Sequence, residues 1–450
     1  MRTVEVRSRK SVLEQFLGLF TEVRAGEGPT VLLLTINLFL ILTAYYVLKP
    51  VREALILAGG GAEIKSYAAA GQALLLLGAV PLYSALASRF TRRRLINTVT
   101  VFFTACLVFF YLLAHLNVPL GVVFYLWMGI FNLMVIAQIW SFANDLYTPE
   151  EGKRLFPIVA FGASSGAVFG SFITSHLIGL LGVYQLLLVG AAILILSLLI
   201  TNFIDQREQY QVKIKAGPKP ALSPGEAPIG KGGGFQLVIK SKYLLLIACL
   251  MLFLNWVNTN GEYILGKTVS KAAIEAVASG NSGGLSEKEF IGKFYSDFFT
   301  WVNMLGLLAQ LFLVSRILKY LGIQIAILIL PIIALSGYAL LAFYPILGVV
   351  RWVKIAENAT DYSLQNTVRN ALFLPTTREE KYKAKQAVDT FFVRAGDVLS
   401  AGLVYVGVNK LAFNTKNFAL VNLGLVVIWF ILAIFIGKKN QQLTTPASQS

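Results

Sequence analysis

Charged residues inside apolar segments are the feature of this sequence with the clearest chemical content. The stretch YYVLKPVREALIL, residues 45–57, carries Lys49, Arg52 and Glu53 within an otherwise apolar run. Lys49 and Glu53 have the i,i+4 spacing of a helical ion pair. Lysine and arginine hold anionic groups, and a carboxylate pairs with them or binds a cation. These three residues are therefore candidates for a site that binds an anion.

A second polar stretch, RWVKIAENATDYSLQNTVRNAL, lies at residues 351–372. Five of its side chains recur at i,i+3 and i,i+4 intervals and so share one face of a helix. They are Lys354, Glu357, Asp361, Gln365 and Arg369. A third stretch, FLNWVNTNGEYIL at residues 253–265, adds amides and a glutamate around Gly261. The sequence thus places polar side chains in several apolar runs that are far apart along the chain.

The predicted substrate-binding residues are Lys49, Arg52, Glu53, Gln138, Asn258, Asn260, Glu262, Lys354, Glu357, Asp361, Tyr362 and Arg369. We expect the cations to hold anionic groups and the amides to contact polar groups of the ligand. The carboxylates are expected to pair with the cations or to bind a coupling ion. The alternative is that these charges only pair with one another and fix the packing of helices.

The elements that position these residues are membrane-spanning helices. Of the 450 residues, 56% are hydrophobic and only 14% are charged, against about 25% charged residues in a soluble domain. Runs such as residues 31–48, 95–114 and 183–204 reach the length of about 20 apolar residues that a helix needs to cross a bilayer. Because a helix satisfies its own backbone hydrogen bonds in lipid, we predict an all-α membrane protein.

About twelve such runs occur, in two groups of six on either side of a Pro-, Gly- and Lys-rich segment. We expect two six-helix halves with the major-facilitator layout and a substrate site between them near mid-membrane. Pro50 is expected to kink the first span and Gly261 to interrupt the seventh. The expected domains are a cytoplasmic N-terminal segment (1–29), an N-terminal half (30–204), a cytoplasmic linker (205–235), a C-terminal half (236–437) with an outer insertion at 266–293, and a cytoplasmic tail (438–450).

The formal net charge of +16 has a topological explanation. Lysine and arginine gather near the N-terminus, at RFTRRR (89–94), in the linker and at REEKYKAK (378–385). Twelve spans with a cytoplasmic N-terminus put all these segments on the cytoplasmic side, as the positive-inside rule requires. Both termini are therefore expected inside, and nucleic acid is not expected as a partner.

The segment GEYILGKT, residues 261–268, matches the phosphate-binding pattern G-x-x-x-x-G-K-[ST]. A working P-loop follows a β-strand and offers successive backbone N–H groups to phosphates. Here the preceding segment is an expected membrane helix, so we expect no ATP hydrolysis and no enzyme activity. Cys106 and Cys249 lie within expected spans and have no metal-ligand spacing, so no cofactor is expected.

These motifs resemble those of the ATP/ADP translocase family, the nucleotide transporters of plastid envelopes and intracellular bacteria. The first span of that family reads Y-x-[IL]-L-[RK]-x-x-K-[DE]-x-L, where this chain has YYVLKPVREAL (45–55). By this resemblance Arg52 takes the position of an important lysine. Glu262 resembles a glutamate of the family's seventh span, and Lys267 the lysine that follows it.

Three positions depart from that pattern. Gln138 stands where the family has a functional glutamate, while Asp361 and Arg369 each stand where it has a lysine. These changes alter the charge of the expected cavity. The resemblance therefore implies a nucleotide transporter but leaves open whether the substrate is ATP and ADP or another nucleotide-like anion.

Taken together, the sequence predicts an alternating-access transporter of an anionic metabolite, in the first place a nucleotide, by exchange or by uptake. A proton-coupled symporter of another small solute is the alternative, because the cavity also holds carboxylates that can titrate. An alternative of another class is a non-transporting receptor or scaffold on a transporter fold. The expected setting is a bacterial inner membrane, with membrane lipid as surroundings and a monomeric chain.

Overall fold

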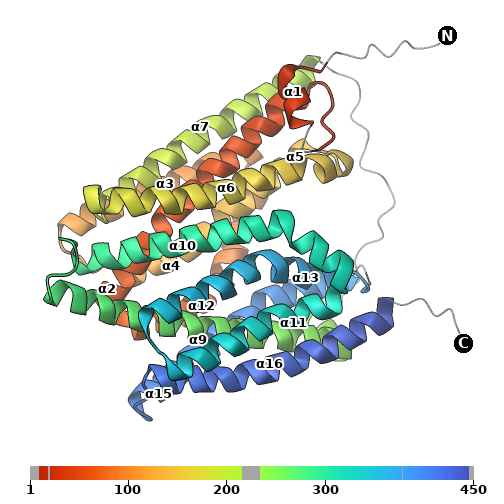
Figure 1. Cartoon of the computed structure of the whole chain (residues 1–450). Coiled ribbons are helices and arrows are strands. Elements are labelled where there is room, and N and C mark those ends of the chain that lie inside the picture. The colour runs from red at the N-terminus through yellow and green to blue at the C-terminus, as the bar shows by residue number, and fades with distance from the viewer. Residues whose placement is uncertain (1–9, 19–20, 215–233, 378, 445–450) are drawn as a thin grey trace, which may run out of the picture. The chain divides into compact units, whose positions relative to one another are not determined.

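The computed structural model describes residues 10–18, 21–214, 234–377 and 379–444. Those residues form helices and connections, with no strand among them. Residues 1–9, 215–233 and 445–450, which belong to the expected N-terminal segment, linker and tail, lie outside the described residues. The prediction of an all-α protein is confirmed (Figure 1).

The first part of the chain forms α1 (Val12–Leu17), α2 (Gly28–Arg89), α3 (Arg92–His115), α4 (Gly121–Phe131), the π-helical turn η1 (Asn132–Ile136), α5 (Ala137–Leu146), α6 (Pro149–Leu181) and α7 (Gln185–Ile214). The second part forms α8 (Gly234–Lys240), α9 (Lys242–Ala278), α10 (Glu287–Phe312), α11 (Val314–Phe343), α12 (Leu347–Thr360), η2 (Asp361–Gln365), α13 (Asn366–Ala371), η3 (Glu380–Ala384), α14 (Lys385–Ala387), η4 (Val388–Phe392), α15 (Val393–Asn409) and α16 (Thr415–Thr444).

Nine of the described helices are long and apolar enough to cross a membrane. The first of them, α2, is counted as one helix but contains two spans. Gly61 separates these spans, because its φ of 72° and ψ of −178° break the helical backbone. Only glycine adopts such a conformation without strain. The polar helix α10 and the segment from α12 to α13 are not among the nine, and they correspond to the apolar runs expected near residues 294–318 and 345–373. The helices thus follow the twelve predicted spans of a multi-pass membrane protein.

Several boundaries differ from those expected. The helix α7 continues to Ile214, well into the expected linker. At the outer insertion, α9 continues to Ala278 and α10 begins at Glu287, so the connection between them is short. The prediction that Gly261 interrupts the seventh span is wrong, because α9 is helical through this residue. Pro50 also lies inside α2, whose break in backbone angles falls at Gly61.

The chain forms two compact units that do not simply follow the sequence order. The first unit contains residues 1–52, 78–120 and 127–219, and the second contains residues 53–77, 121–126 and 220–450. In the second unit α9 packs against α10, α12, α15 and α16, and α11 packs against α12 and α16. The division of the chain into an N-terminal and a C-terminal half stays a prediction.

Close helix packing in the first unit depends on glycine. Gly162, Gly166 and Gly170 recur every four residues along α6 and face the backbone of α2. A Cβ atom at Gly166 would lie 2.2 Å from the carbonyl oxygen of Phe39. Small residues at this spacing let two membrane helices approach closely and gain van der Waals contact.

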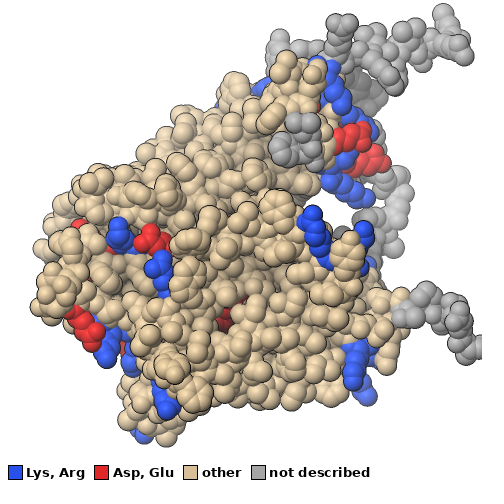
Figure 2. Space-filling model, viewed as in Figure 1, with Lys and Arg blue, Asp and Glu red and all other residues tan. Residues whose placement is uncertain are grey.

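The distribution of charge agrees with a membrane setting. On the face that Figure 2 shows, the charged residues gather near the ends of the helices. The surface along α11 and α16 between those ends is formed by uncharged residues. Large apolar side chains of these two helices are exposed, among them Ile332, Leu340, Val427 and Phe435. Apolar side chains exposed over a whole helix length are the pattern of contact with lipid tails.

Candidate functional site

A chain of ion pairs runs through the interior of the second unit. Lys65 Nζ lies 2.7 Å from Glu53 Oε2 and 3.7 Å from Glu262 Oε2. Lys354 Nζ lies 3.7 Å from the other oxygen of Glu262 and 2.9 Å from Glu357 Oε2. We call these five residues the ion cluster. Its members come from α2, α9 and α12, so helices distant in sequence meet through their charges.

Neutral polar groups complete the coordination of the ion cluster. Lys354 donates a hydrogen bond to Asn258 Oδ1 at 2.8 Å, and the Tyr338 hydroxyl donates to Glu357 at 3.0 Å. Asn358 Nδ2 donates to Glu262 Oε1 at 3.1 Å. The ammonium of Lys65 lies 5.3 Å from the centre of the Tyr295 ring, within the range of a cation–π contact. Such partners offset part of the cost of burying charge.

The helical periodicity of α12 explains how it contributes to the cluster. Lys354, Glu357 and Asn358 lie within one turn, and their side chains point to the same side of the helix. All three are buried, as are Ser363 and Gln365 further along. The polar stripe predicted from the spacing is therefore a buried face. Lys354 fits against α9 because residue 261 there is glycine.

Burial differs among the members of the ion cluster. Lys354 is completely buried, whereas the Glu262 side chain is 24% exposed. Among the described residues the cluster holds three carboxylates and two ammonium groups. An unpaired charge is costly to bury, so the pairs of this cluster depend on one another. Glu262, the most exposed member, is the one that a solute can reach first.

Other predicted site residues of the second unit lie outside the ion cluster. Asp361 pairs with Arg369 at 3.5 Å, one turn or more beyond Glu357 along the same helical segment. Tyr362 is 43% exposed on the neighbouring face. Asn260 is fully buried and bonds to Asn422 at 3.1 Å and to Ser400 at 2.6 Å. Both polar groups of Asn260 thus join α9 to α15 and α16.

The first unit holds the remaining predicted residues. The ammonium of Lys49 lies 5.0 Å from the centre of the Tyr46 ring and 5.9 Å from that of Tyr45. Arg52 is half-buried. Gln138 is buried in α5, and its Oε1 has no hydrogen-bond partner among the described residues. A buried amide oxygen without a partner is costly, which fits a position that contacts a ligand or water.

Three residues in or beside the ion cluster were not predicted from the sequence. Lys65 follows the run GGGAEI, which reads as a connection between two spans, but it is buried inside α2. Tyr295 and Tyr338 are isolated tyrosines within helices, and such tyrosines most often serve in packing. The only signal for Lys65 is a lysine close to the edge of an apolar run.

The P-loop match has a helical conformation that excludes phosphate binding of that kind. Residues 261–268 lie inside α9, where backbone N–H groups are engaged in the helix. The Thr268 hydroxyl donates to the carbonyl oxygen of Ile264, and Lys267 Nζ lies 3.0 Å from Glu63 Oε1. The lysine and threonine of the motif are therefore engaged elsewhere.

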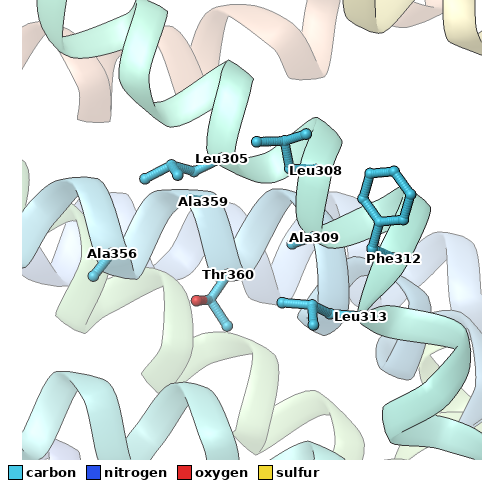
Figure 3. A pocket seen from close by; sticks show the side chains of 8 residues that line it. All are labelled: Leu305, Leu308, Ala309, Phe312, Leu313, Ala356, Ala359 and Thr360. Carbon is cyan, nitrogen blue, oxygen red and sulfur yellow. The ribbon is translucent and has the colours of Figure 1, made fainter.

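A groove of about 430 Å³ lies between α10 and α12 (Figure 3). Its lining is apolar apart from Thr360: Leu305, Leu308, Ala309, Phe312, Leu313, Ala356, Ala359 and Thr360. By helical periodicity Ala356 and Ala359 occupy the side of α12 opposite to Lys354 and Glu357, while Thr360, three residues after Glu357, lies between the two sides. The groove offers no cation and is unsuited to an anion. The two faces of α12 thus have different chemistry.

The fold is that of transporters with the major-facilitator layout. A nucleoside transporter, NupG, superposes with a TM-score of 0.61 at 14% identity, covering 92% of this chain and 99% of that one. A D-xylose-proton symporter superposes with a TM-score of 0.58 at 13% identity, covering 93% of this chain and 98% of that one. The predicted fold class is confirmed by these similarities.

The relatives by sequence are ADP,ATP carrier proteins. ADP,ATP carrier protein 5 of Rickettsia prowazekii is 22% identical, covering 95% of this chain and 96% of that protein. ADP,ATP carrier protein 1 of Chlamydia pneumoniae is 22% identical over 355 residues, which span 68% of this chain and only 64% of that protein. No protein-family model matches the chain. The resemblance seen in the sequence motifs is confirmed, and the chain is a divergent relative of these carriers.

Proposed function

We propose that the protein is an alternating-access membrane transporter of a nucleotide or a closely related anion. The observation that carries this proposal is the similarity to an ADP,ATP carrier protein along 95% of the chain. The fold of a nucleoside transporter supports it. The ion cluster adds buried ammonium groups, which are suited to hold phosphate.

The proposed substrate-binding residues follow the expectation from the sequence. Lys49, Arg52, Lys354 and Arg369 hold anionic groups of the substrate, and Glu262, Glu357 and Asp361 pair with these cations when no substrate is bound. Asn258 and Gln138 contact polar groups of the ligand. For Asn260, predicted to contact the ligand, we propose a packing role instead, because its amide is bonded to Asn422 and Ser400.

A proton-coupled symporter is the second candidate, and one observation favours it. The ion cluster has more carboxylates than ammonium groups among the described residues. Carboxylates buried inside a membrane protein can bind a proton, as a symporter of this kind requires. Uptake driven by a pH gradient without a counter-substrate would distinguish this mechanism from exchange.

The proposal includes a non-enzymatic role without a cofactor. The relatives and structural neighbours are transporters, which points away from catalysis. The proposed location is the inner membrane of a bacterium, with both termini in the cytoplasm and the chain acting as a monomer. The positive-inside pattern supports that orientation.

The first test is a thermal-shift screen of detergent-purified protein against nucleotides, nucleosides and sugar phosphates. Stabilisation by one group of nucleotides, lost in Arg52→Ala, is expected and would select the substrate for flux in liposomes. Arg52→Ala is expected to fold and to lose transport. Full transport by this variant would reject the role of Arg52, and a response only to other solutes would reject the nucleotide substrate.

A further inference from the structure

The Glu262 carboxylate lies between two buried ammonium groups, in an arrangement that a bound anion could also adopt. Its Oε2 faces Lys65 and its Oε1 faces Lys354, each at 3.7 Å. One carboxylate thus bridges two cations that come from different helices. A phosphate group also presents several oxygens and can bridge two cations in this way.

Glu262 is held more loosely than the other two carboxylates of the cluster. Lys65 has a close partner in Glu53 at 2.7 Å, and Lys354 has one in Glu357 at 2.9 Å. A separation of 3.7 Å is too long for a hydrogen bond, so attraction between charges and one hydrogen bond from Asn358 hold Glu262 in place. Each ammonium therefore has one close and one more distant carboxylate partner.

The exposure of the three carboxylates follows the same order. The Glu53 and Glu357 side chains are 1% and 3% exposed, whereas that of Glu262 is 24% exposed. The loosely held carboxylate is thus the most exposed of the three, and we expect an incoming solute to reach it before Glu53 and Glu357. Glu262 also repels an anion that approaches the two ammonium groups, since like charges at short range interact unfavourably.

We infer that Lys65 and Lys354 form a two-lysine site for a phosphate group, which Glu262 occupies when no ligand is bound. An anion that reaches both ammonium groups displaces the Glu262 carboxylate, and the carboxylate returns when the anion leaves. Glu262 thereby weakens binding and aids release, which a transporter requires as much as binding. The inference rests on the proposed transport of an anion and adds Lys65 to the site.

The test measures binding of inorganic pyrophosphate to the full-length, detergent-purified protein by calorimetry. Glu262→Gln keeps the shape of the side chain but removes its charge, so it should bind pyrophosphate about tenfold more tightly or better. Lys65→Gln should bind it at least about tenfold more weakly, and Lys65→Arg should retain binding. Lys271→Gln, which breaks an exposed pair with Glu275 on α9, is the control and should bind as wild type does.

A gain of affinity separates this role from a structural one, since loss of a packing contact would not strengthen binding. Unchanged or weaker binding by Glu262→Gln would overturn the inference, and so would wild-type affinity in a folded Lys65→Gln. If Lys65→Gln does not fold, the binding measured for Glu262→Gln alone decides.

Flux of ATP into liposomes is measured in parallel. Tighter pyrophosphate binding by Glu262→Gln without ATP flux by the wild type would reject the nucleotide substrate but keep the two-lysine site. ATP flux without tighter binding would keep the nucleotide substrate and reject the two-lysine site.

Discussion

Gly261 on α9 faces Tyr338 on α11 so closely that a Cβ atom on the glycine would lie 2.0 Å from the tyrosine hydroxyl oxygen. The same atom would lie 2.9 Å from Lys354 Nζ. The glycine is therefore needed for space rather than for backbone freedom. It lets the hydroxyl of Tyr338 and the ammonium of Lys354 reach Glu357 together.

Gly261→Ala should displace Tyr338 and Lys354 and thereby weaken both the fold and the site. Overpacking of this kind costs about 1–3 kcal/mol. We expect a lower melting temperature and weaker stabilisation by nucleotide. Gly424→Ala on α16, where a Cβ atom meets nothing within 4 Å, is the matched control. An alanine at 261 that melts and binds as wild type does would show that this contact relaxes freely.

Lys354→Met should be among the most destabilising changes in the second unit. The lysine is fully buried and contacts Glu262 and Glu357, so its removal leaves Glu262 with Lys65 alone and takes from Glu357 its cation in the ion cluster. Breaking a buried pair from one side costs about 3–5 kcal/mol. The double variant Lys354→Met with Glu357→Gln should recover part of this loss. Thermal melts of the two single variants and the double variant measure the coupling, and additive effects would show that the two residues act independently.

Gly166→Ala should separate α6 from α2 in the first unit. The added methyl group would meet the carbonyl oxygen of Phe39, which is backbone and cannot rotate away. We expect a loss of about 1–3 kcal/mol, read as a lower melting temperature. Gly402→Ala, which has open space on α15, should melt as wild type does. Equal melting of both variants would contradict the close packing.

Acid should weaken the contact between the start of α2 and α6. Burial favours the neutral form of Glu27, but hydrogen bonds from Arg154 and from the backbone N–H of Arg24 outweigh it and hold the pKa of Glu27 below its usual value. A lowered carboxyl pKa contributes stability that is present above the unfolded pKa of about 4.3 and is lost as the pH falls through the folded value.

The matched variant is Glu27→Gln, which cannot titrate. Its melting temperature should be lower than that of the wild type at pH 7, and the difference should shrink below about pH 4. Thermal melts across this pH range measure the effect. A difference that stays constant down to pH 3 would assign the acid sensitivity to other groups.

Purified protein should release no phosphate from ATP. The helical conformation of residues 261–268 and the pairing of Lys267 with Glu63 leave no phosphate cradle there. A sensitive phosphate-release assay on wild type and on Lys267→Ala is the measurement. Hydrolysis by the wild type that Lys267→Ala removes would restore the P-loop interpretation.

The spans were predictable because each apolar run is long enough to cross a bilayer, and such runs are local in sequence. The polar face of α12 and η2 was predictable for the same reason, since Lys354, Glu357 and Asp361 recur with the helical period. Lys65 was not, because its partner Glu53 lies before the backbone break at Gly61 and its partner Glu262 lies on α9.

Periodicity also does not tell which neighbour a face meets. Asn260 and Glu262 are two residues apart on α9, yet Asn260 bonds to α15 and α16 and Glu262 joins the ion cluster. The role of Gly261 was mistaken for a helix break, since its reason lies in the size of Tyr338 and Lys354 opposite. Such pairings depend on tertiary contacts.

The excess of one carboxylate in the ion cluster has an electrical consequence. While all five side chains are ionised, Glu53, Glu262 and Glu357 outweigh Lys65 and Lys354 by one negative charge. A full unit charge that crosses the membrane potential exchanges about 2.3 kcal/mol per 100 mV. Any rearrangement that carries this cluster through part of the bilayer therefore responds to voltage, and a bound ligand or proton that changes the charge also changes that response.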